Sequence, residues 1–173
     1  MATTFTLIKT YTLASNTASI DFTSIPATYT DLCLKLSLRT DRPSSGYGYF
    51  DIAFNNSTAN QNYIRLLGYG TGVNSGTNTQ NIIATNTDDA TANTFGNWEM
   101  YLPNYAGSTY KSFSMDATNE DISGLRETPF NELGAGLWSI TTAVNRITLS
   151  PWSGYGTVFK TYSSASLYGI LKA

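Results

Sequence analysis

The chain has 173 residues, of which 41% are hydrophobic, 13% aromatic and only 13% charged, and its formal net charge is −2. This length suits a single domain over residues 1–173, and sparse charge among many apolar residues argues against a charged disordered chain. The few Lys and Arg residues are scattered singly, so the sequence predicts no nucleic-acid partner, because binding to phosphates needs clustered cations.

The chain lacks the sequence features of membrane proteins and secreted proteins. No window approaches the run of about 18 apolar residues that a membrane-spanning helix needs. The N-terminal stretch Met1–Leu13 has neither the charged start nor the apolar core of a signal peptide. We therefore expect no membrane partner, and we expect synthesis in the cytoplasm.

Apolar side chains recur at every second position along most of the chain, which is the period of a β-strand with one buried face. The leucines from Leu32 to Leu38, for example, alternate with mostly polar residues. Eleven strands are predicted on this basis, in chain order: Phe5–Leu13, Ala18–Thr23, Asp31–Arg39, Tyr49–Asn55, Tyr63–Leu67, Asn81–Thr85, Asn97–Leu102, Lys111–Ala117, Leu137–Thr142, Asn145–Ser150 and Ala165–Leu171.

Residues that favour turns separate nearly all of these predicted strands. Gly, Pro, Asn and Ser are concentrated at Pro43–Gly46, Pro103–Asn104 and Ser153–Gly156. Short strands at regular spacing with such turns are typical of a sandwich or barrel. The sequence predicts an all-β fold, an antiparallel, jelly-roll-like β-sandwich of about eleven short strands.

Three stretches do not fit the strand pattern. Gly68–Thr79 and Asn86–Thr94 are rich in Gly, Thr and Asn, and are predicted to be the two long loops, which are the usual place for partner contacts. The best helical pattern, Asp121–Leu133, is broken by Gly124 and Pro129, so at most one short helical turn is expected there.

The absence of histidine removes most catalytic arrangements. The chain has no His and one Cys, Cys33. This excludes the Ser-His-Asp triad, the Cys-His pair, disulfides within the chain and thiolate metal clusters. Cys33 lies in an alternating apolar run, which predicts a buried structural thiol. With no phosphate-binding glycine motif either, we expect no enzyme activity and no cofactor.

Two kinds of carboxylate site remain to be considered. Glycoside hydrolysis needs only a pair of carboxylates, and the candidates are Asp51, Glu99, Asp116, Glu120, Asp121, Glu127 and Glu132. The first three fall on predicted polar faces, where a solvated acid is the simpler interpretation. The oxygen-rich stretches Asn86–Asp89 and Asp116–Asp121 could bind calcium, but neither has the spacing of a calcium loop, and capped turns are favoured.

Aromatic residues are the remaining signal, with twelve Tyr, eight Phe and three Trp. Many of the tyrosines fall in predicted turns, where amphipathic rings can stack on sugars or anchor a protein interface. Alternatively, each of these tyrosines covers one end of the hydrophobic core. The candidate interface residues are Tyr47, Tyr69, Tyr105, Trp152 and Tyr155.

The two ends of the chain carry a resemblance to a known group. Tyr11–Leu13 with Ile20–Leu32, and the closing stretch Ser164–Ile170, resemble the corresponding parts of small β-sandwich virion structural proteins of tailed phages, of the head decoration or cement type. The matching stretches cover about a quarter of the chain and contain no catalytic motif. The resemblance implies a jelly-roll-like virion protein, either a head decoration protein or a small tail-fibre domain.

These observations lead to one functional hypothesis and two alternatives. The leading hypothesis is a capsid decoration protein located in the virion, which reinforces the head shell, binds the major capsid protein and forms a homo-oligomer, a trimer or a dimer. Self-contact is expected around Trp152 and Tyr155, and over the closing strand Ser166–Ile170, which has apolar residues on both faces. The alternatives are a tail-fibre or receptor-binding module for host surface glycans, and an enzyme acting on polysaccharide.

Overall fold

The computed structural model describes residues 4–43, 48–70, 72–78, 82–121 and 128–171. These residues contain no helix and twelve strands: β1 Phe5–Thr12, β2 Ile20–Phe22, β3 Asp31–Leu38, β4 Gly48–Phe54, β5 Gln61–Tyr69, β6 Gly72–Asn78, β7 Ile82–Thr85, β8 Gly96–Pro103, β9 Lys111–Asp121, β10 Thr128–Trp138, β11 Ile147–Pro151 and β12 Ser164–Ile170. The all-β prediction is confirmed.

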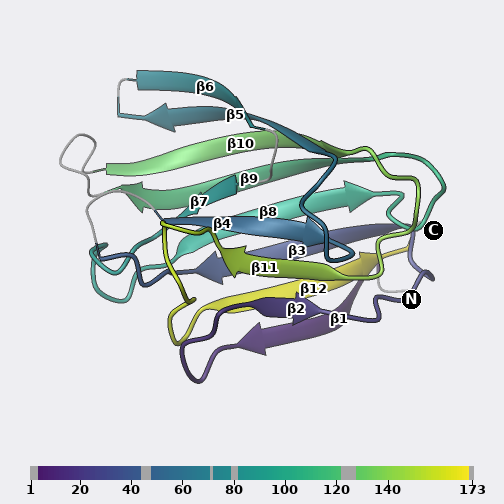
Figure 1. The fold of residues 1–173 in the computed structure, drawn as a ribbon, viewed down its shortest axis with the longest axis horizontal. Helices are drawn as coiled ribbons and strands as arrows, with labels where there is room; N and C mark the ends of the chain where they lie inside the picture. The colour runs from purple at the N-terminus through teal and green to yellow at the C-terminus, as the bar shows by residue number, and fades with distance from the viewer. Residues whose placement is uncertain (1–3, 44–47, 71, 79–81, 122–127, 172–173) are drawn as a thin grey trace.

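The strands form two antiparallel sheets that pack face to face (Figure 1). The large sheet has eight strands in the order β1-β12-β3-β8-β9-β10-β5-β6, and the small sheet has four in the order β2-β11-β4-β7. Eight of the twelve strands pair as β1 with β12, β2 with β11, β3 with β8, and β4 with β7. This nested pairing across two sheets is the connectivity of a jelly roll, which confirms the predicted fold class.

The other four strands are two insertions that widen the large sheet. The hairpin of β5 and β6 lies between β4 and β7 in the chain, and the hairpin of β9 and β10 lies between β8 and β11. Pairing of β10 with β5 joins the two hairpins into one extension of the sheet beyond β8. The large sheet therefore extends beyond the β7 edge of the small sheet.

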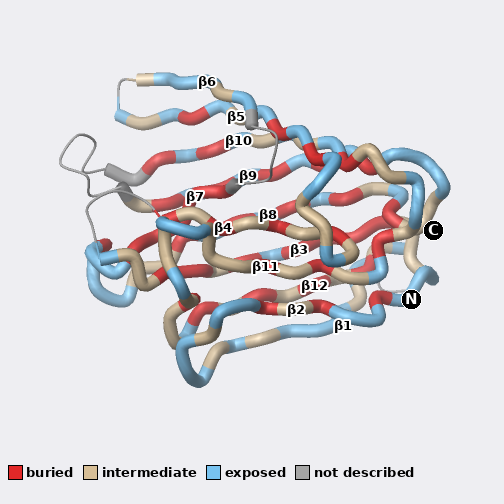
Figure 2. Tube along the Cα trace, in the orientation of Figure 1, coloured by how far each residue is buried: buried red, intermediate tan, exposed pale blue. Residues whose placement is uncertain are grey.

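The core lies between the two sheets and follows the predicted alternation (Figure 2). Leu32, Leu34 and Leu38 of β3 are fully buried, as are Phe50 and Phe54 of β4. Burial of these side chains removes apolar surface from water, which is the main favourable contribution to the free energy of folding.

A second, smaller cluster shows how the large sheet curves. Leu67 of β5 and Phe130 of β10 pack with Ala84 of β7, and Tyr49 of β4 packs against them. Tyr49 and Ala84 are paired residues on the face of the small sheet that points away from the main core. The extension of the large sheet therefore bends around the β7 edge and contacts the outer face of the small sheet.

Three predicted elements are wrong in detail. Residues 72–78, predicted to be loop, form β6, because an edge strand paired on one side can be mostly polar. The stretch predicted as a helical turn contributes residues 128–133 to β10. Because β10 ends at Trp138, the predicted strand Leu137–Thr142 is largely irregular. The period-two pattern of β10 is hidden because its inward positions include Glu132 and two glycines instead of apolar side chains.

Candidate functional site

The structure separates the five predicted interface residues. Tyr47 lies outside the described residues. Tyr105 is fully buried, its hydroxyl donates a hydrogen bond to the Pro26 carbonyl oxygen, and its own carbonyl accepts one from the Val144 amide (2.9 Å). The interface assignment of Tyr105 is therefore wrong, because this ring closes one end of the core. The remaining three, Tyr69, Trp152 and Tyr155, are half-buried.

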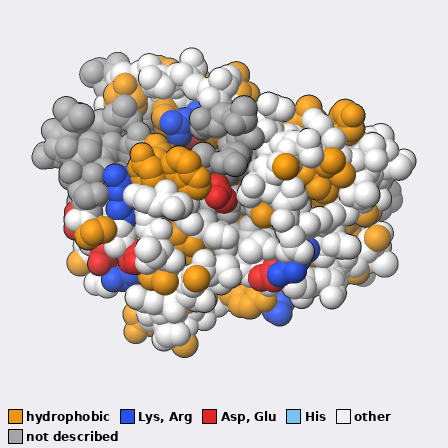
Figure 3. Space-filling view, in the orientation of Figure 1, with side chains coloured by type: hydrophobic (Ala, Val, Ile, Leu, Met, Phe, Trp, Pro, Cys, Tyr) orange, Lys and Arg blue, Asp and Glu red, His pale blue; other side chains and the backbone are white. Residues whose placement is uncertain are grey.

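Trp152 and Tyr155 belong to an aromatic cluster that also contains Tyr49. The Trp152 and Tyr155 rings stack with centroids 5.1 Å apart and an interplanar angle of 21°. The Tyr49 ring meets both edge-on, at 6.1 Å from Trp152 and 4.7 Å from Tyr155. The Arg42 guanidinium lies 4.3 Å from the centre of the Tyr155 ring. Figure 3 shows an apolar area on this face, toward the start of β4.

Backbone geometry next to β11 brings these distant residues together. The Trp152 amide donates to the Tyr49 carbonyl oxygen (2.8 Å), which extends the pairing of β11 with β4 by one residue. The Tyr155 amide donates to the Trp152 carbonyl oxygen (2.9 Å) and closes a tight turn. Gly154 has φ +84° in this turn, a conformation that glycine adopts without strain.

Asp51 lies beside the aromatic cluster. It is two residues after Tyr49 on the same face of β4, and its strand partner is Ser150 of β11. The carboxyl is half-buried, and its Oδ1 atom has no hydrogen-bond partner among the described residues. Burial raises the pKa of Asp51 from 3.8 to about 6. The prediction that Asp51 is a solvated acid is wrong, because the residue is half-buried and one of its carboxyl oxygens is shielded from solvent.

A second surface feature is an apolar face on the outside of the large sheet, away from the core. It consists of five exposed aliphatic side chains of β5, β6 and β10: Ile64, Leu66, Val73, Leu133 and Leu137, which are 54%, 46%, 71%, 54% and 36% exposed. Leu66 is paired directly with Leu133, and Ile64 with Ala135, so the side chains form one patch. Ile64, Ala135 and Leu137 also line a hollow of about 370 Å³.

The sequence pattern contains a signal for this apolar face. In β5, Tyr63 and Leu67 point into the core, while Ile64 and Leu66 point to the outside. A strand with apolar residues on both faces is expected to be covered on both sides. Apolar residues at successive positions of the predicted strand Tyr63–Leu67 are therefore the sequence signal for this surface.

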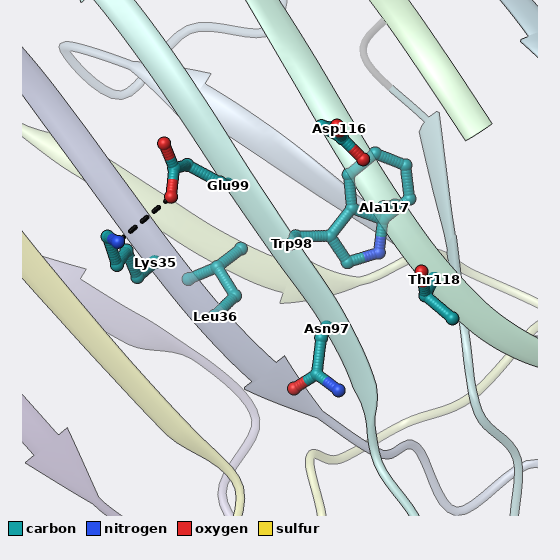
Figure 4. Close-up of a pocket in the computed structure, with 8 residues that line it drawn as sticks. All are labelled: Lys35, Leu36, Asn97, Trp98, Glu99, Asp116, Ala117 and Thr118. Carbon is teal, nitrogen blue, oxygen red and sulfur yellow. Dashed lines mark ion pairs between the residues drawn. The ribbon is translucent and has the colours of Figure 1, made fainter. Parts of the chain in front are cut away.

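The carboxylates considered for glycoside hydrolysis include one adjacent pair. Glu99 of β8 and Asp116 of β9 are strand partners on the outside of the large sheet, where they line a hollow of about 470 Å³ (Figure 4). Glu99 forms an ion pair with Lys35 (2.9 Å), and both side chains are more than half exposed. Asp116 is exposed as well. The solvated interpretation of these two acids is confirmed, because neither carboxyl is enclosed by protein.

Two of the other acids have structural partners. Glu120 accepts hydrogen bonds from the hydroxyls of Thr91 and Thr94, which lower its pKa against the opposing effect of burial. Glu132 is fully buried, accepts a hydrogen bond from the Tyr63 hydroxyl (2.6 Å), and has a raised pKa because of its burial. Glu127 and the side chain of Asp121 lie outside the described part of the chain.

The predicted partner loop Asn86–Thr94 is held in place by an arginine. Arg39 is 7% exposed, and its guanidinium donates hydrogen bonds to the carbonyl oxygens of Asp88, Ala90, Thr91 and Thr94, at 2.9 to 3.1 Å. The planar guanidinium presents several donors in fixed directions, so one side chain can satisfy several carbonyls. The sequence pattern predicted this loop but not Arg39 as its anchor.

The structure also bears on the predictions for Cys33, metals and membranes. Cys33 is buried, as predicted, and burial raises the pKa of its thiol to about 11. In the described ranges, no group of three or more acidic or cysteine side chains is arranged to hold a metal ion. No helix among the described residues could span a membrane.

Comparisons with family models and with curated proteins identify no relative of this chain. No protein-family model matches the chain. No curated protein has significant sequence similarity to it.

Proposed function

We propose that this chain is a non-enzymatic virion structural protein, a capsid decoration protein that binds the major capsid protein of a tailed-phage head. The observation that carries the proposal is the apolar face of β5, β6 and β10. Five large aliphatic side chains on one sheet face are more than a scatter of single exposed residues, and such patches mark protein interaction sites.

The shape and composition of the apolar face favour a protein as its partner. Strand partners hold the side chains at regular spacing, so the face can pack against another sheet or an extended strand. The side chains around its hollow are uncharged, with Asn62, Thr77 and Leu137 among them. An uncharged rim around an apolar centre is typical of contacts between proteins.

A second apolar area supports self-association of the proposed homo-oligomer, a trimer or a dimer. Phe5 and Leu7 of β1 are 51% and 50% exposed, and they pair with Ile170 and Tyr168 of the closing strand β12. The Phe5 and Tyr168 rings are 6.3 Å apart. This area lies at the opposite edge of the large sheet from the apolar face, so one copy could contact capsid and neighbour at once, and many weak contacts would add.

The alternative, a tail-fibre or receptor-binding module for host glycans, is favoured by one specific observation. Half-buried aromatic rings lie on the same sheet face as the half-buried Asp51 carboxyl, and aromatic rings beside a hydrogen-bonding group can bind a sugar. Position on the particle separates the two functions. We therefore propose immunogold electron microscopy of the particles of the encoding phage, with an antibody raised against this chain. Gold over the heads is expected; gold only at the tail ends, or none, would contradict the decoration function.

Paired variants test the assignment of the two apolar areas. The double substitution Leu66→Thr with Leu133→Thr should weaken binding to heads by at least about tenfold, because each buried aliphatic side chain contributes on the order of 1.5 kcal/mol or more. The matched pair Phe5→Thr with Leu7→Thr should reduce the oligomer mass in light scattering and should weaken head binding less than the first pair, because each copy keeps its capsid-binding face. Equal head binding by both double variants would contradict the assignment.

A further inference from the structure

The outer face of the small sheet carries two cross-strand pairs of different chemistry, side by side. Tyr49 of β4 lies opposite Trp152, which follows β11, and Asp51 lies opposite Ser150. Tyr49 and Asp51 are two residues apart on one strand, so their side chains lie on the same face. We call these four residues the platform: two aromatic rings next to a carboxylate and a hydroxyl.

The aromatic stack ends on Trp152. The Arg42 guanidinium and the Trp152 ring both lie against the Tyr155 ring, at 4.3 Å and 5.1 Å from its centre. The Arg42 guanidinium and the Trp152 ring therefore both cover part of the Tyr155 ring. Tyr49 meets the Trp152 ring in an edge-to-face contact. Trp152 itself is only half-buried, so part of its side chain remains accessible to a ligand.

The Asp51 carboxyl is the hydrogen-bond acceptor of the platform. Its Oδ1 atom is shielded from water and accepts no hydrogen bond from the residues that the structure describes, so this oxygen is out of reach of a ligand. The carboxyl as a whole is only half-buried, and a ligand hydroxyl can donate a hydrogen bond to the part of it that faces solvent. Ser150 beside it can donate or accept one further hydrogen bond.

We propose that the platform binds a pyranose ring of an uncharged polysaccharide. A pyranose has an apolar face of C–H groups and a rim of hydroxyls, so its C–H face would stack on Trp152 while ring hydroxyls donate to Asp51. A neutral sugar is preferred over an acidic one, because a second negative charge would be repelled by the Asp51 carboxylate. This inference goes beyond the proposed structural function and uses a different surface.

The platform is suited to binding and not to cleavage. Asp51 is the only carboxylate of β4 and β11, and glycoside hydrolysis needs a second carboxyl placed across the scissile bond. The polysaccharide is therefore expected to remain intact on the protein.

Affinity electrophoresis of the full chain tests this inference. Four soluble uncharged polysaccharides serve as probes: dextran, laminarin, yeast mannan and a β-galactan. At least one should retard the chain. Trp152→Ala should weaken that retardation at least about tenfold, and Asp51→Asn, which turns one acceptor oxygen into a donor, about fivefold or more. Trp152→Phe, which keeps a stacking ring, should retain most of the binding even if Trp152→Ala lowers stability.

A matched control and the variants of the apolar face make the outcome decisive. Tyr110 is 58% exposed away from the platform, so Tyr110→Ala should bind as the unmodified chain does. The Leu66→Thr, Leu133→Thr variant should bind polysaccharide normally, and Trp152→Ala should bind phage heads normally, so the two proposals fail separately. No retardation by any probe, or equal retardation of the unmodified chain and folded Trp152→Ala, would overturn the inference.

Discussion

Asp21 and Asp51 lie on the outer face of the same four-stranded sheet, yet their carboxyls have opposite pKa shifts. Asp21 accepts hydrogen bonds from Arg146 (2.8 Å from Nε to Oδ1) and from the Thr148 hydroxyl (2.9 Å), and these lower its pKa. In the part of the chain that the structure describes, no such donor lies beside Asp51, and burial raises its pKa to about 6. Residue type and strand face are the same, so the neighbours decide the acidity.

The Asp51 carboxyl should make the folded state less stable as the pH rises from about 4 to about 6. In this window the folded protein holds the Asp51 proton more tightly than the unfolded chain, so ionisation disfavours folding by up to about 3 kcal/mol above pH 6. Asp51→Asn should abolish this decline, which urea unfolding at pH 4, 5, 6 and 7 would measure.

Asp21→Asn is the matched control for this experiment. The folded-state pKa of Asp21 is lowered, so its contribution to stability is present above the unfolded pKa of 3.8 and is lost as the pH falls through the folded pKa. The variant should therefore be less stable than the unmodified chain near neutral pH. Identical pH profiles for Asp51→Asn and the unmodified chain would contradict the burial of Asp51.

Among the strands, β10 has two glycines at positions where the core leaves no space for a side chain. Gly134 and Gly136 lie on its inner face, and a Cβ atom there would lie 2.3 Å from the Tyr63 hydroxyl oxygen and 2.0 Å from the Phe113 ring. The two aromatic rings thus pass directly over the β10 backbone. The glycines give the rings this space, at the cost of a weaker strand pattern in the sequence.

Gly136→Ala should destabilise the protein by about 1–3 kcal/mol, because the Phe113 ring must move out of a packed core. Gly68 of the neighbouring β5 is the control, since a Cβ there meets no atom within 4 Å. Gly68→Ala should leave stability unchanged or raise it slightly. Thermal unfolding followed by circular dichroism compares the two, and an equal loss in both variants would show that crowding at Gly136 is not the cause.

At the scale of the whole molecule, the jelly-roll pairing joins the two ends of the chain. β12 lies between β1 and β3 and buries Ala165 and Leu167, whereas β1 forms the outer edge of the sheet. Because β12 pairs with strands from the start of the chain, most of the sequence must be in place before this part of the sheet can close. Such non-local pairing is typical of slowly folding proteins.

The different positions of the two terminal strands predict different effects of truncation. Removing residues 164–173 should prevent folding, because β1 loses its partner and the core loses Leu167. Removing residues 1–12 takes away only an edge strand and should leave a folded but less stable protein. Near-ultraviolet circular dichroism and amide exchange would distinguish these outcomes. A folded chain without residues 164–173 would contradict the central role of β12.

The fold class and most of the strands could be predicted from the amino-acid sequence, because the period-two pattern of β3, β4, β8 and β12 reflects local burial. The sequence also identified Trp152 and Tyr155 as surface aromatics near a turn, and Cys33 as a buried thiol. Each of these inferences depends on residues close together in the chain.

The sequence pattern does not indicate which distant residues share a surface, because this depends on how the strands pair in the folded protein. Tyr49 and Asp51 join Trp152 because β4 pairs with β11, and Ile64 joins Leu133 on one face because β5 pairs with β10. Tyr105 faces the core instead of a partner because its loop folds back toward Pro26. Strand pairing between remote segments sets these contacts, and no local pattern records which strands will be neighbours.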